Sequence, residues 1–273
     1  MTDYINKIKE TADFLTAKGY HDASFAIVLG TGLGHFVNKM KIISQLSYSE
    51  IPHFPISTVE FHKGNLLLGL IGDKKVIAMQ GRFHYYEGYT MQEITFPVRV
   101  MKQLGARQLL LSNAAGGINP HFKKGDLVLI EDHINLQPEN PLRGLFDPAF
   151  GNRFVDMSEP YDNNLNRLLF EHAGRLNIKL KKGVYASVMG PNLETKAEYR
   201  YIANIGADMV GMSTVPEVIV ANHIGLKCAA VSVITDECDP ANLKPVDIAE
   251  IIKVAGEADG ILSHLFEMVI KNQ

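Results

Sequence analysis

The chain has 273 residues, a length that fits one α/β domain because such folds often exceed 200 residues. Hydrophobic residues make up 46% of it and charged residues 21%, as is typical of a globular protein with a sizeable core. The formal net charge of −3 argues against a general surface for nucleic acids or anionic membranes. Any anionic ligand would therefore have to be bound by a few local groups.

The two cysteines, Cys228 and Cys238, lack the spacing of metal ligands and predict no disulfide framework. Residues 1–15 are charged and amphipathic, without the apolar segment of a secretory leader. No apolar run is long enough to span a bilayer. We therefore expect a protein of the reducing cytoplasm with no bound metal and no membrane partner.

The hydrophobic pattern predicts strands that alternate with helices. Ile5, Ile8 and Leu15 have helical spacing, so the chain should open with a surface helix. This order favours a largely parallel sheet that is covered by helices on both faces. Further expected strands are 25–29, 66–71, 75–79, 107–112, 127–130, 184–188, 208–210 and 229–234, and further expected helices are 91–104, 161–176, 195–203, 216–223 and the remainder to about residue 270.

Residues 135–156 interrupt this alternation. They are rich in Pro, Asn and Gly, which predicts a long loop. A long loop with many apolar side chains is often functional or packs against a partner. The large apolar side chains of this segment are Leu142, Leu145, Phe146, Phe150 and Phe154.

A glycine-rich turn, LGTGLGHF, follows the first predicted strand at residues 29–36. Its spacing, G-x-G-x-G, is one residue short of the dinucleotide fingerprint, and His35 and Phe36 stand where a P-loop needs Lys and Ser or Thr. What remains is a tight loop in which the Thr31 hydroxyl can donate to a small oxyanion. The alternative is a plain strand-to-helix turn that needs positive φ. The glycines are Gly30, Gly32 and Gly34.

The stretch GRFHYYEGY, residues 81–89, places Arg82, His84, Tyr86 and Glu87 just after an apolar strand. Ligands of open α/β sheets bind at that end of the strands. Arg82 offers a planar fork of donors that suits phosphate, and His84 is a second donor that can change its charge. A lone histidine is more often simply held by packing, but Arg-x-His at a strand end favours a ligand site.

Two glycine-containing stretches offer close approach to a ligand. SNAAGGIN, residues 112–119, ends an apolar strand in Ala and Gly residues, which let a ligand lie against bare backbone, although it would also suit a simple turn. GPNLET, residues 190–195, places Glu194 just before a helix, where a carboxylate can bind a ligand or only cap the helix.

A third stretch, residues 206–225, places Met212, Ser213 and Thr214 between a strand and a helix that Pro216 begins. Ser213 can donate its hydroxyl to a phosphate, and Met212 offers a soft apolar surface. Together with the preceding stretches, this region predicts a site that contains both anion donors and apolar contacts.

These motifs resemble those of the trimeric purine nucleoside phosphorylases. GTGLG, GRFHYYEGY, NAAGGIN, GPNLET and GMSTVPEV occur in the order of that family, over nearly the whole chain. The resemblance implies a single α/β domain over residues 1–273, with a mixed, partly barrel-like central sheet, in a cytoplasmic homotrimer. It also implies a pentosyltransferase that cleaves purine nucleosides with phosphate to free purine and ribose 1-phosphate. Phosphate would be a substrate, and no cofactor or nucleic acid would be needed.

The resemblance also assigns roles to residues. His84, Glu194 and Asp236 would be catalytic, and Phe154 would reach into the ribose site of a neighbouring subunit. The phosphate-binding residues would be Thr31, His62, Arg82, His84, Ala114 through its backbone, and Ser213. The nucleoside-binding residues would be Tyr86, Ala115, Gly116, Phe154, Tyr185, Leu193, Glu194, Val210, Met212 and Asp236.

The residue types suit this chemistry. Cleavage of an N-glycosidic bond builds positive charge on ribose C1′ and negative charge on the departing purine, so neither a metal nor a covalent nucleophile is required. Arg82 and His84 would position phosphate as the nucleophile, and donors to the purine would stabilise it as it leaves. A hydrolytic nucleosidase, which would not need phosphate, and a non-catalytic nucleoside-binding protein are the rival interpretations.

Asp236 stands in VITDE where the 6-oxopurine-specific members carry Asn. An ionised Asp would repel N7 and O6, whereas a protonated Asp could donate to N7 and accept from a 6-amino group. The alternative is that Asp236 is a solvated or capping residue. A second departure is that Ile248 or a neighbour stands where the family has a histidine for the ribose 5′-hydroxyl.

Both departures resemble the methylthioadenosine phosphorylases, but NAAGGIN and GPNLET have the purine nucleoside phosphorylase form. We therefore expect inosine and guanosine as substrates, with tolerance of adenosine. A methylthioadenosine phosphorylase is the alternative.

Overall fold

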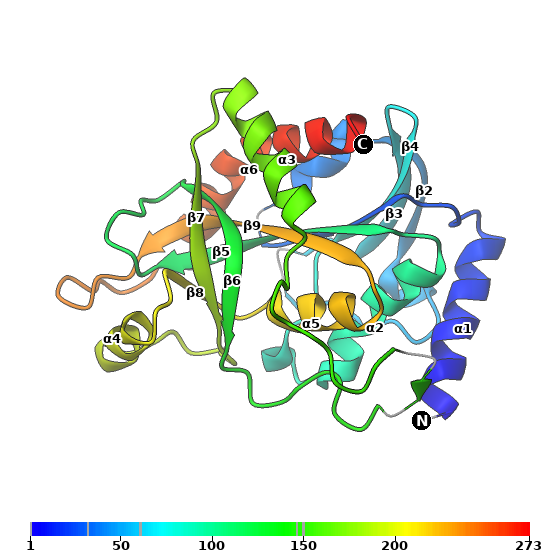
Figure 1. The fold of residues 1–273 in the computed structure, drawn as a ribbon, viewed down its shortest axis with the longest axis horizontal. Coiled ribbons are helices and arrows are strands. Elements are labelled where there is room, and N and C mark those ends of the chain that lie inside the picture. Colours follow the sequence, from blue (N-terminus) through cyan, green and yellow to red (C-terminus); the bar gives the residue numbers. More distant parts are fainter. Residues whose placement is uncertain (1, 32, 60–61, 146, 149–150) are drawn as a thin grey trace.

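The computed structural model describes residues 2–31, 33–59, 62–145, 147–148 and 151–273 (Figure 1). Gly32, Phe146 and Phe150, which the sequence singled out, lie outside the described residues. The helices are α1 Thr2–Ala17, α2 Met91–Gln103, α3 Asn163–Arg175, α4 Lys196–Asn204, α5 Val215–His223 and α6 Ile248–Lys271. The strands are β1 Phe25–Leu29, β2 Lys41–Ser47, β3 Asn65–Ile71, β4 Lys74–Gln80, β5 Gln108–Gly117, β6 Leu127–Asn135, β7 Leu180–Ser187, β8 Met209–Gly211 and β9 Lys227–Glu237.

The strands form one sheet in the order β2-β3-β4-β1-β5-β8-β7-β6-β9. Strand β5 also pairs with β9, so β5, β8, β7, β6 and β9 close into a ring. The pairs β2–β3, β3–β4, β5–β8 and β6–β9 are antiparallel. The expected single α/β domain with a mixed, partly barrel-like sheet is therefore confirmed, and the largely parallel sheet expected from the element order is wrong.

The central strands separate two apolar cores, because successive side chains of a strand point to opposite faces. Leu109 and Leu111 of β5 pack with α1, α2 and α5, whereas Leu110 packs with α3 and α6. Figure 1 shows these two groups of helices on opposite sides of the sheet. All five residues of β1 are buried, which explains its continuous apolar sequence.

The helices begin where the sequence supplies a cap. Thr90 and Glu93 form a capping box at the start of α2, and Thr195 and Glu198 form another at α4. Because the cap of α4 is at Thr195, Glu194 lies outside the helix and is directed by the loop before it.

The structure differs from the expected elements in two places. Residues 235–247, expected in the last helix, complete β9 and then form a loop, because Asp247 caps α6 only at Ile248. Strand β2 was not expected, because this edge strand has no buried residue and therefore no apolar alternation. Within the described residues, none of the helices is both long and apolar enough to cross a membrane.

A buried carboxylate joins α6 to the segment that follows β1. Asp259 is 1% exposed, and its Oδ2 accepts a hydrogen bond from the His35 backbone N–H at 2.6 Å. Its Oδ1 accepts another from the Ser263 hydroxyl at 2.8 Å. The position of the glycine turn is thereby tied to the last helix of the chain.

We expect Asp259→Ala to lower the free energy of unfolding by about 1–3 kcal/mol, because the His35 N–H and the Ser263 hydroxyl lose their acceptor. Urea unfolding measures this. Asp73→Ala is the control, since the Asp73 side chain is 82% exposed, and its effect should stay within about 0.5 kcal/mol. Equal losses in the two variants would contradict the structural role of Asp259.

Candidate active site

A cavity opens where the carboxyl ends of several strands meet. This is where ligands bind in open α/β sheets. The segments after β1, β4 and β8, the ends of β5 and β9, and the loop before α4 all contribute. The lining residues are Gly30, Thr31, Arg82, His84, Tyr86, Asn113, Ala114, Ala115, Gly116, Leu193, Glu194, Tyr199, Val210, Gly211, Met212, Ser213, Thr235, Asp236 and Ile251.

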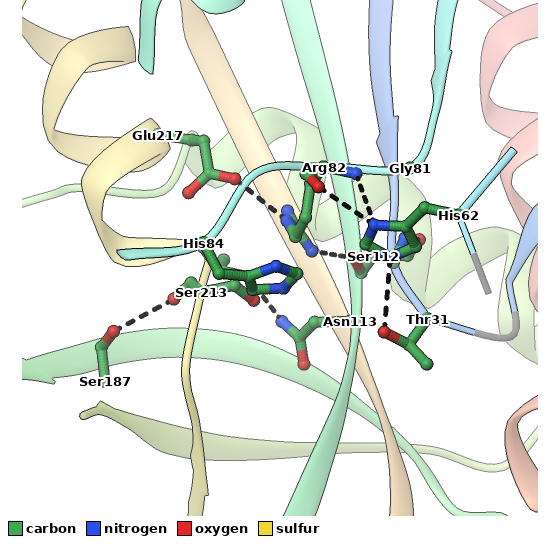
Figure 2. A network of polar contacts seen from close by, with 12 residues as sticks. Thr31, His62, Gly81, Arg82, His84, Ser112, Asn113, Ser187, Ser213 and Glu217 are labelled. Carbon is green, nitrogen blue, oxygen red and sulfur yellow. Dashed lines mark hydrogen bonds and ion pairs between the residues drawn. The ribbon is translucent and has the colours of Figure 1, made fainter. Parts of the chain in front are cut away.

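Arg82 is the buried cation of the cavity, at 1% exposure. Its Nε donates to Glu217 Oε1 at 3.0 Å, and Nη1 donates to the Ser112 carbonyl at 2.5 Å (Figure 2). Its Nη2 is buried and has no hydrogen-bond partner among the described residues. A buried donor without an acceptor costs free energy, so the fork is incomplete without an anion.

His84 lies beside Arg82, between two other rings. Its ring stacks on that of His62 at 5.5 Å between centroids and on that of Tyr86 at 4.7 Å. Its Nδ1 lies 2.9 Å from Glu87 Oε1. Burial raises the pKa of Glu87, but hydrogen bonds from His84 and Thr58 outweigh this and bring it to about 2. Glu87 is therefore ionised at neutral pH, His84 Nδ1 carries the proton, and Nε2 remains for a ligand.

His62 connects two parts of the site without lining the cavity. Its Nε2 lies 3.4 Å from Thr31 Oγ1, and its Nδ1 lies 3.0 Å from the carbonyl oxygen of Arg82. Burial, helped by the nearby His84 and Arg82, lowers the pKa of His62 to about 4. The ring is therefore neutral at pH 7, which limits the positive charge next to Arg82.

Gly30 is required at the first position of the glycine turn by close packing rather than by positive φ. A Cβ there would lie 2.7 Å from the Ser112 carbonyl oxygen and 2.8 Å from Asn113 Cα. The turn therefore packs directly against β5, and this contact brings Thr31 to the cavity.

Ser213 is held by a strained turn. The following residue, Thr214, has φ +70° and ψ −51°, and the Val215 N–H donates to the Ser213 carbonyl at 2.8 Å. This tight turn is unfavourable for a residue with a side chain and costs on the order of 1–3 kcal/mol. Asn113 Nδ2 donates to Thr214 Oγ1 at 2.9 Å and so holds the turn (Figure 2). Strain at a cavity wall is a common feature of functional sites.

The opposite end of the cavity carries two carboxylates. Asp236 lies near the end of β9, and Glu194 lies before α4. Burial raises the pKa of Glu194, and the charge of Asp236 also raises it, while hydrogen bonds from its own backbone and from Tyr199 lower it. Val210 and Met212 supply apolar contacts between the two ends. The cavity therefore has one end with the Arg82 guanidinium and neutral polar groups, and another with two carboxyl groups.

Most of the residues predicted from the sequence line this one cavity. They are Thr31, Arg82, His84, Tyr86, Ala114, Ala115, Gly116, Leu193, Glu194, Val210, Met212, Ser213 and Asp236. Tyr185 is fully buried behind the wall, where its hydroxyl accepts from the Ser213 N–H at 3.4 Å. Phe154 is 87% exposed and borders a separate hollow with Leu142 and Arg143.

The sequence reasoning missed Asn113, Tyr199, Thr235 and Ile251 as lining residues. Asn113 precedes Ala114 and Thr235 precedes Asp236, so each could have been predicted from its position next to a predicted site residue. Ile251 lies three residues after Ile248, on the same side of α6, and Ile248 itself is 50% exposed. No local signal points to Tyr199. Among the described residues, no cluster of three or more His, Cys, Asp or Glu could hold a metal ion.

Comparison with known proteins identifies relatives of the chain. A model described as the phosphorylase superfamily matches residues 24–271. "Purine nucleoside phosphorylase 1" of Bacillus subtilis (strain 168) is 47% identical over 249 residues, which cover 91% of this chain and 92% of that protein. These matches confirm the resemblance that the five motifs indicated.

Two solved structures from Schistosoma mansoni are similar over nearly their whole length. Isoform 2 of purine nucleoside phosphorylase, in complex with cytosine and ribose-1-phosphate, has a TM-score of 0.91 and 40% identity, covering 97% of this chain and 95% of that one. Purine nucleoside phosphorylase in complex with adenosine has a TM-score of 0.90 and 36% identity, covering 98% and 97%.

We expect the free energy of unfolding to fall as the pH is lowered from about 6.5 to about 4. The pKa of His62 is about 4 in the folded protein and about 6.5 in the unfolded chain. As the pH falls, the unfolded chain therefore takes up this proton first. Each such proton lowers stability by up to about 1.4 kcal/mol per pH unit in this window. Urea unfolding from pH 4.5 to 7.5 should give a shallower slope for His62→Asn. Equal slopes would mean that His62 is not responsible.

Proposed function

Because this chain belongs to the phosphorylase superfamily, we propose that its cavity binds inorganic phosphate at the Arg82 end and a purine nucleoside toward Glu194 and Asp236. Its activity is that of a purine nucleoside phosphorylase, a pentosyltransferase. We place phosphate at the Arg82 end because the Arg82 guanidinium is buried and its Nη2 has no hydrogen-bond partner among the described residues. A tetrahedral oxyanion is the ligand that completes such a fork.

The phosphate site is assembled from polar groups on separate segments. We assign to it Thr31, Arg82, His84, Ser213 and the backbone at Ala114, with His62 supporting Thr31 from behind. His84 presents Nε2, which is the acceptor of the neutral ring and can bind an O–H of phosphate. The strained turn fixes the position of the Ser213 hydroxyl. These groups hold phosphate in place against the ribose, an arrangement that can contribute several powers of ten to the rate.

The reaction exchanges one bond at ribose C1′ for another. The C1′–N9 bond breaks with its electron pair leaving on the purine, and a phosphate oxygen forms the new bond to C1′. Positive charge that develops on the ribose faces the bound phosphate. Negative charge develops on the purine, which leaves as the neutral base by taking up, through solvent, the proton that phosphate loses as it becomes an ester. Phosphate is consumed as a substrate, and no step needs a further cofactor.

The purine end determines which base is bound. We assign Glu194 to the N1 side of the base and Asp236 to N7 and the 6-substituent. Tyr86 and Met212 border the ribose, and Leu193, Val210, Ala115 and Gly116 form the walls. Tyr185 acts from behind the wall, through its contact with the backbone of Ser213.

We also propose a homotrimer in which Phe154 enters the ribose site of a neighbouring subunit. Its side chain is 87% exposed and lies outside the cavity of its own subunit, which supports a role toward another one. We propose a cytoplasmic location, which is supported by two buried cysteines that are both free.

The reaction is tested by incubating the protein with inosine, guanosine, adenosine or methylthioadenosine, with and without orthophosphate. We expect cleavage only with orthophosphate, giving the free purine and the sugar 1-phosphate. Free ribose formed without phosphate would indicate a hydrolytic nucleosidase instead. A strong preference for methylthioadenosine would make the chain a methylthioadenosine phosphorylase, and ligand-dependent stabilisation without turnover would indicate a binding protein.

Ser213→Ala should raise the KM for phosphate about tenfold, because one hydrogen bond to a charged ligand is lost. The KM for the nucleoside should change much less. Ser24→Ala is a matched control, since the Ser24 hydroxyl bonds the Lys75 carbonyl outside the cavity. An unchanged KM for phosphate in Ser213→Ala would remove this residue from the phosphate site.

Asp236→Asn should shift preference toward inosine over adenosine by about tenfold or more. The amide donates to N7 or O6 of a 6-oxopurine, whereas the carboxylate accepts from a 6-amino group. The measurement is the ratio of kcat/KM for the two nucleosides. If both nucleosides respond equally, Asp236 does not contact the 6-position of the base.

A further inference from the structure

Cys238 is a buried cysteine that the reaction described above does not use. It is 1% exposed, and its Sγ–H donates to Asp236 Oδ2 at 3.0 Å. The other carboxylate oxygen, Oδ1, accepts from the Thr235 hydroxyl at 2.9 Å. Both oxygens of Asp236 therefore already accept a hydrogen bond from the protein.

The packing of β5 against β9 fixes this arrangement. Gly116 pairs with Asp236 in the register of the two strands. A Cβ at Gly116 would lie 2.5 Å from Cys238 Sγ and 3.3 Å from Asp236 Oδ2, so thiol and carboxylate lie side by side against bare backbone. The Cys238 N–H also donates to the Gly117 carbonyl at 2.8 Å. The thiol therefore has little freedom to point elsewhere.

Cys238 is buried in the same cluster as Tyr199, whose side chain is 1% exposed. Burial raises the pKa of the Cys238 thiol, and the charge of Asp236 raises it further, so the thiol keeps the proton that it donates. The thiol is thus a permanent donor to Asp236.

These contacts match one class of purine better than the other. A 6-aminopurine presents a donor at the 6-position and an acceptor at N1, whereas a 6-oxopurine presents an acceptor at O6 and a donor at N1–H. Asp236 as an acceptor fits the 6-amino group and repels O6, whereas N7 is an acceptor in both classes and does not distinguish them. Glu194, whose pKa is raised by burial, more readily holds a proton to donate to N1. The pair is complementary to adenine.

We propose that Cys238 is a positioning residue for base selection: its thiol holds Asp236 as a hydrogen-bond acceptor and thereby favours 6-aminopurine nucleosides. This proposal rests on the proposed phosphorolysis. It assigns the selectivity to a side chain that acts through Asp236 from outside the lining of the cavity.

The test measures kcat/KM for adenosine and inosine, with saturating orthophosphate, in four proteins: wild type, Cys238→Ala, Cys238→Ser and Cys228→Ala. The ratio of the two constants comes from one preparation, so the fraction of folded enzyme cancels. Cys228 is the matched control because it is equally buried and free, but its thiol bonds the Pro160 carbonyl outside the cavity.

We expect Cys238→Ala to lower the adenosine-to-inosine ratio about tenfold, the effect of losing one hydrogen bond to a charged acceptor. Cys238→Ser keeps a donor and should restore the ratio, which a purely structural role would not produce. Cys228→Ala should keep the wild-type ratio.

Three results would overturn the proposal while leaving the phosphorylase assignment intact. The first is phosphate-dependent cleavage of inosine but not of adenosine by the wild type. The second is an unchanged ratio in Cys238→Ala, and the third is a lowered ratio that Cys238→Ser does not restore. Absence of phosphate-dependent cleavage of both nucleosides would instead refute the phosphorylase assignment itself.

Discussion

Arg82 and Glu217 form an ion pair from which water is almost excluded, with side chains that are 2% and 5% exposed and atoms 3.0 Å apart. A guanidinium removed from water is costly unless its donors are satisfied. Glu217 of α5 and the Ser112 carbonyl of β5 satisfy two sides. The remaining side faces the cavity. The segment after β4, strand β5 and helix α5 must therefore meet at one point, and the lining of the cavity is arranged around it.

The rest of the Arg82 end of the cavity is built from backbone that is held in place by distant contacts. Thr214 adopts an unfavourable conformation because Asn113, on β5, holds its hydroxyl from the other side of the turn. Gly30 packs against the same strand, and Asp259 of α6 holds the segment after it. Such rigid support places donors where a ligand needs them and avoids reorganisation when it binds. The sheet and both helix layers thus contribute to one small site.

The sequence indicated the site where its residues follow strand ends along the chain. Arg82, Ser213 and Asp236 each stand next to an apolar strand, so local pattern and motif order were sufficient. The contacts that hold these residues could not be read in the same way, because Arg82 and Glu217 are 135 residues apart and Asn113 and Thr214 are 101 apart. The ring closure of β5 with β9 and the unexpected β2 edge likewise depend on pairing between distant segments, which no local pattern encodes.

The two ends of the cavity rest on different parts of the fold. The Arg82 end depends on β4, β5 and α5, whereas the Asp236 end depends on the last residues of β9 and the loop before α4. Strand β5 contributes to both, since its Ser112 carbonyl accepts from Arg82 and its Gly116 lies beside Asp236. Substitutions near Asp236 therefore alter that end of the cavity without disturbing the Arg82 pair, because the contacts of the two groups do not overlap. Because the two ends rest on different contacts, substitutions can change the Asp236 end of the cavity while the Arg82 end stays the same.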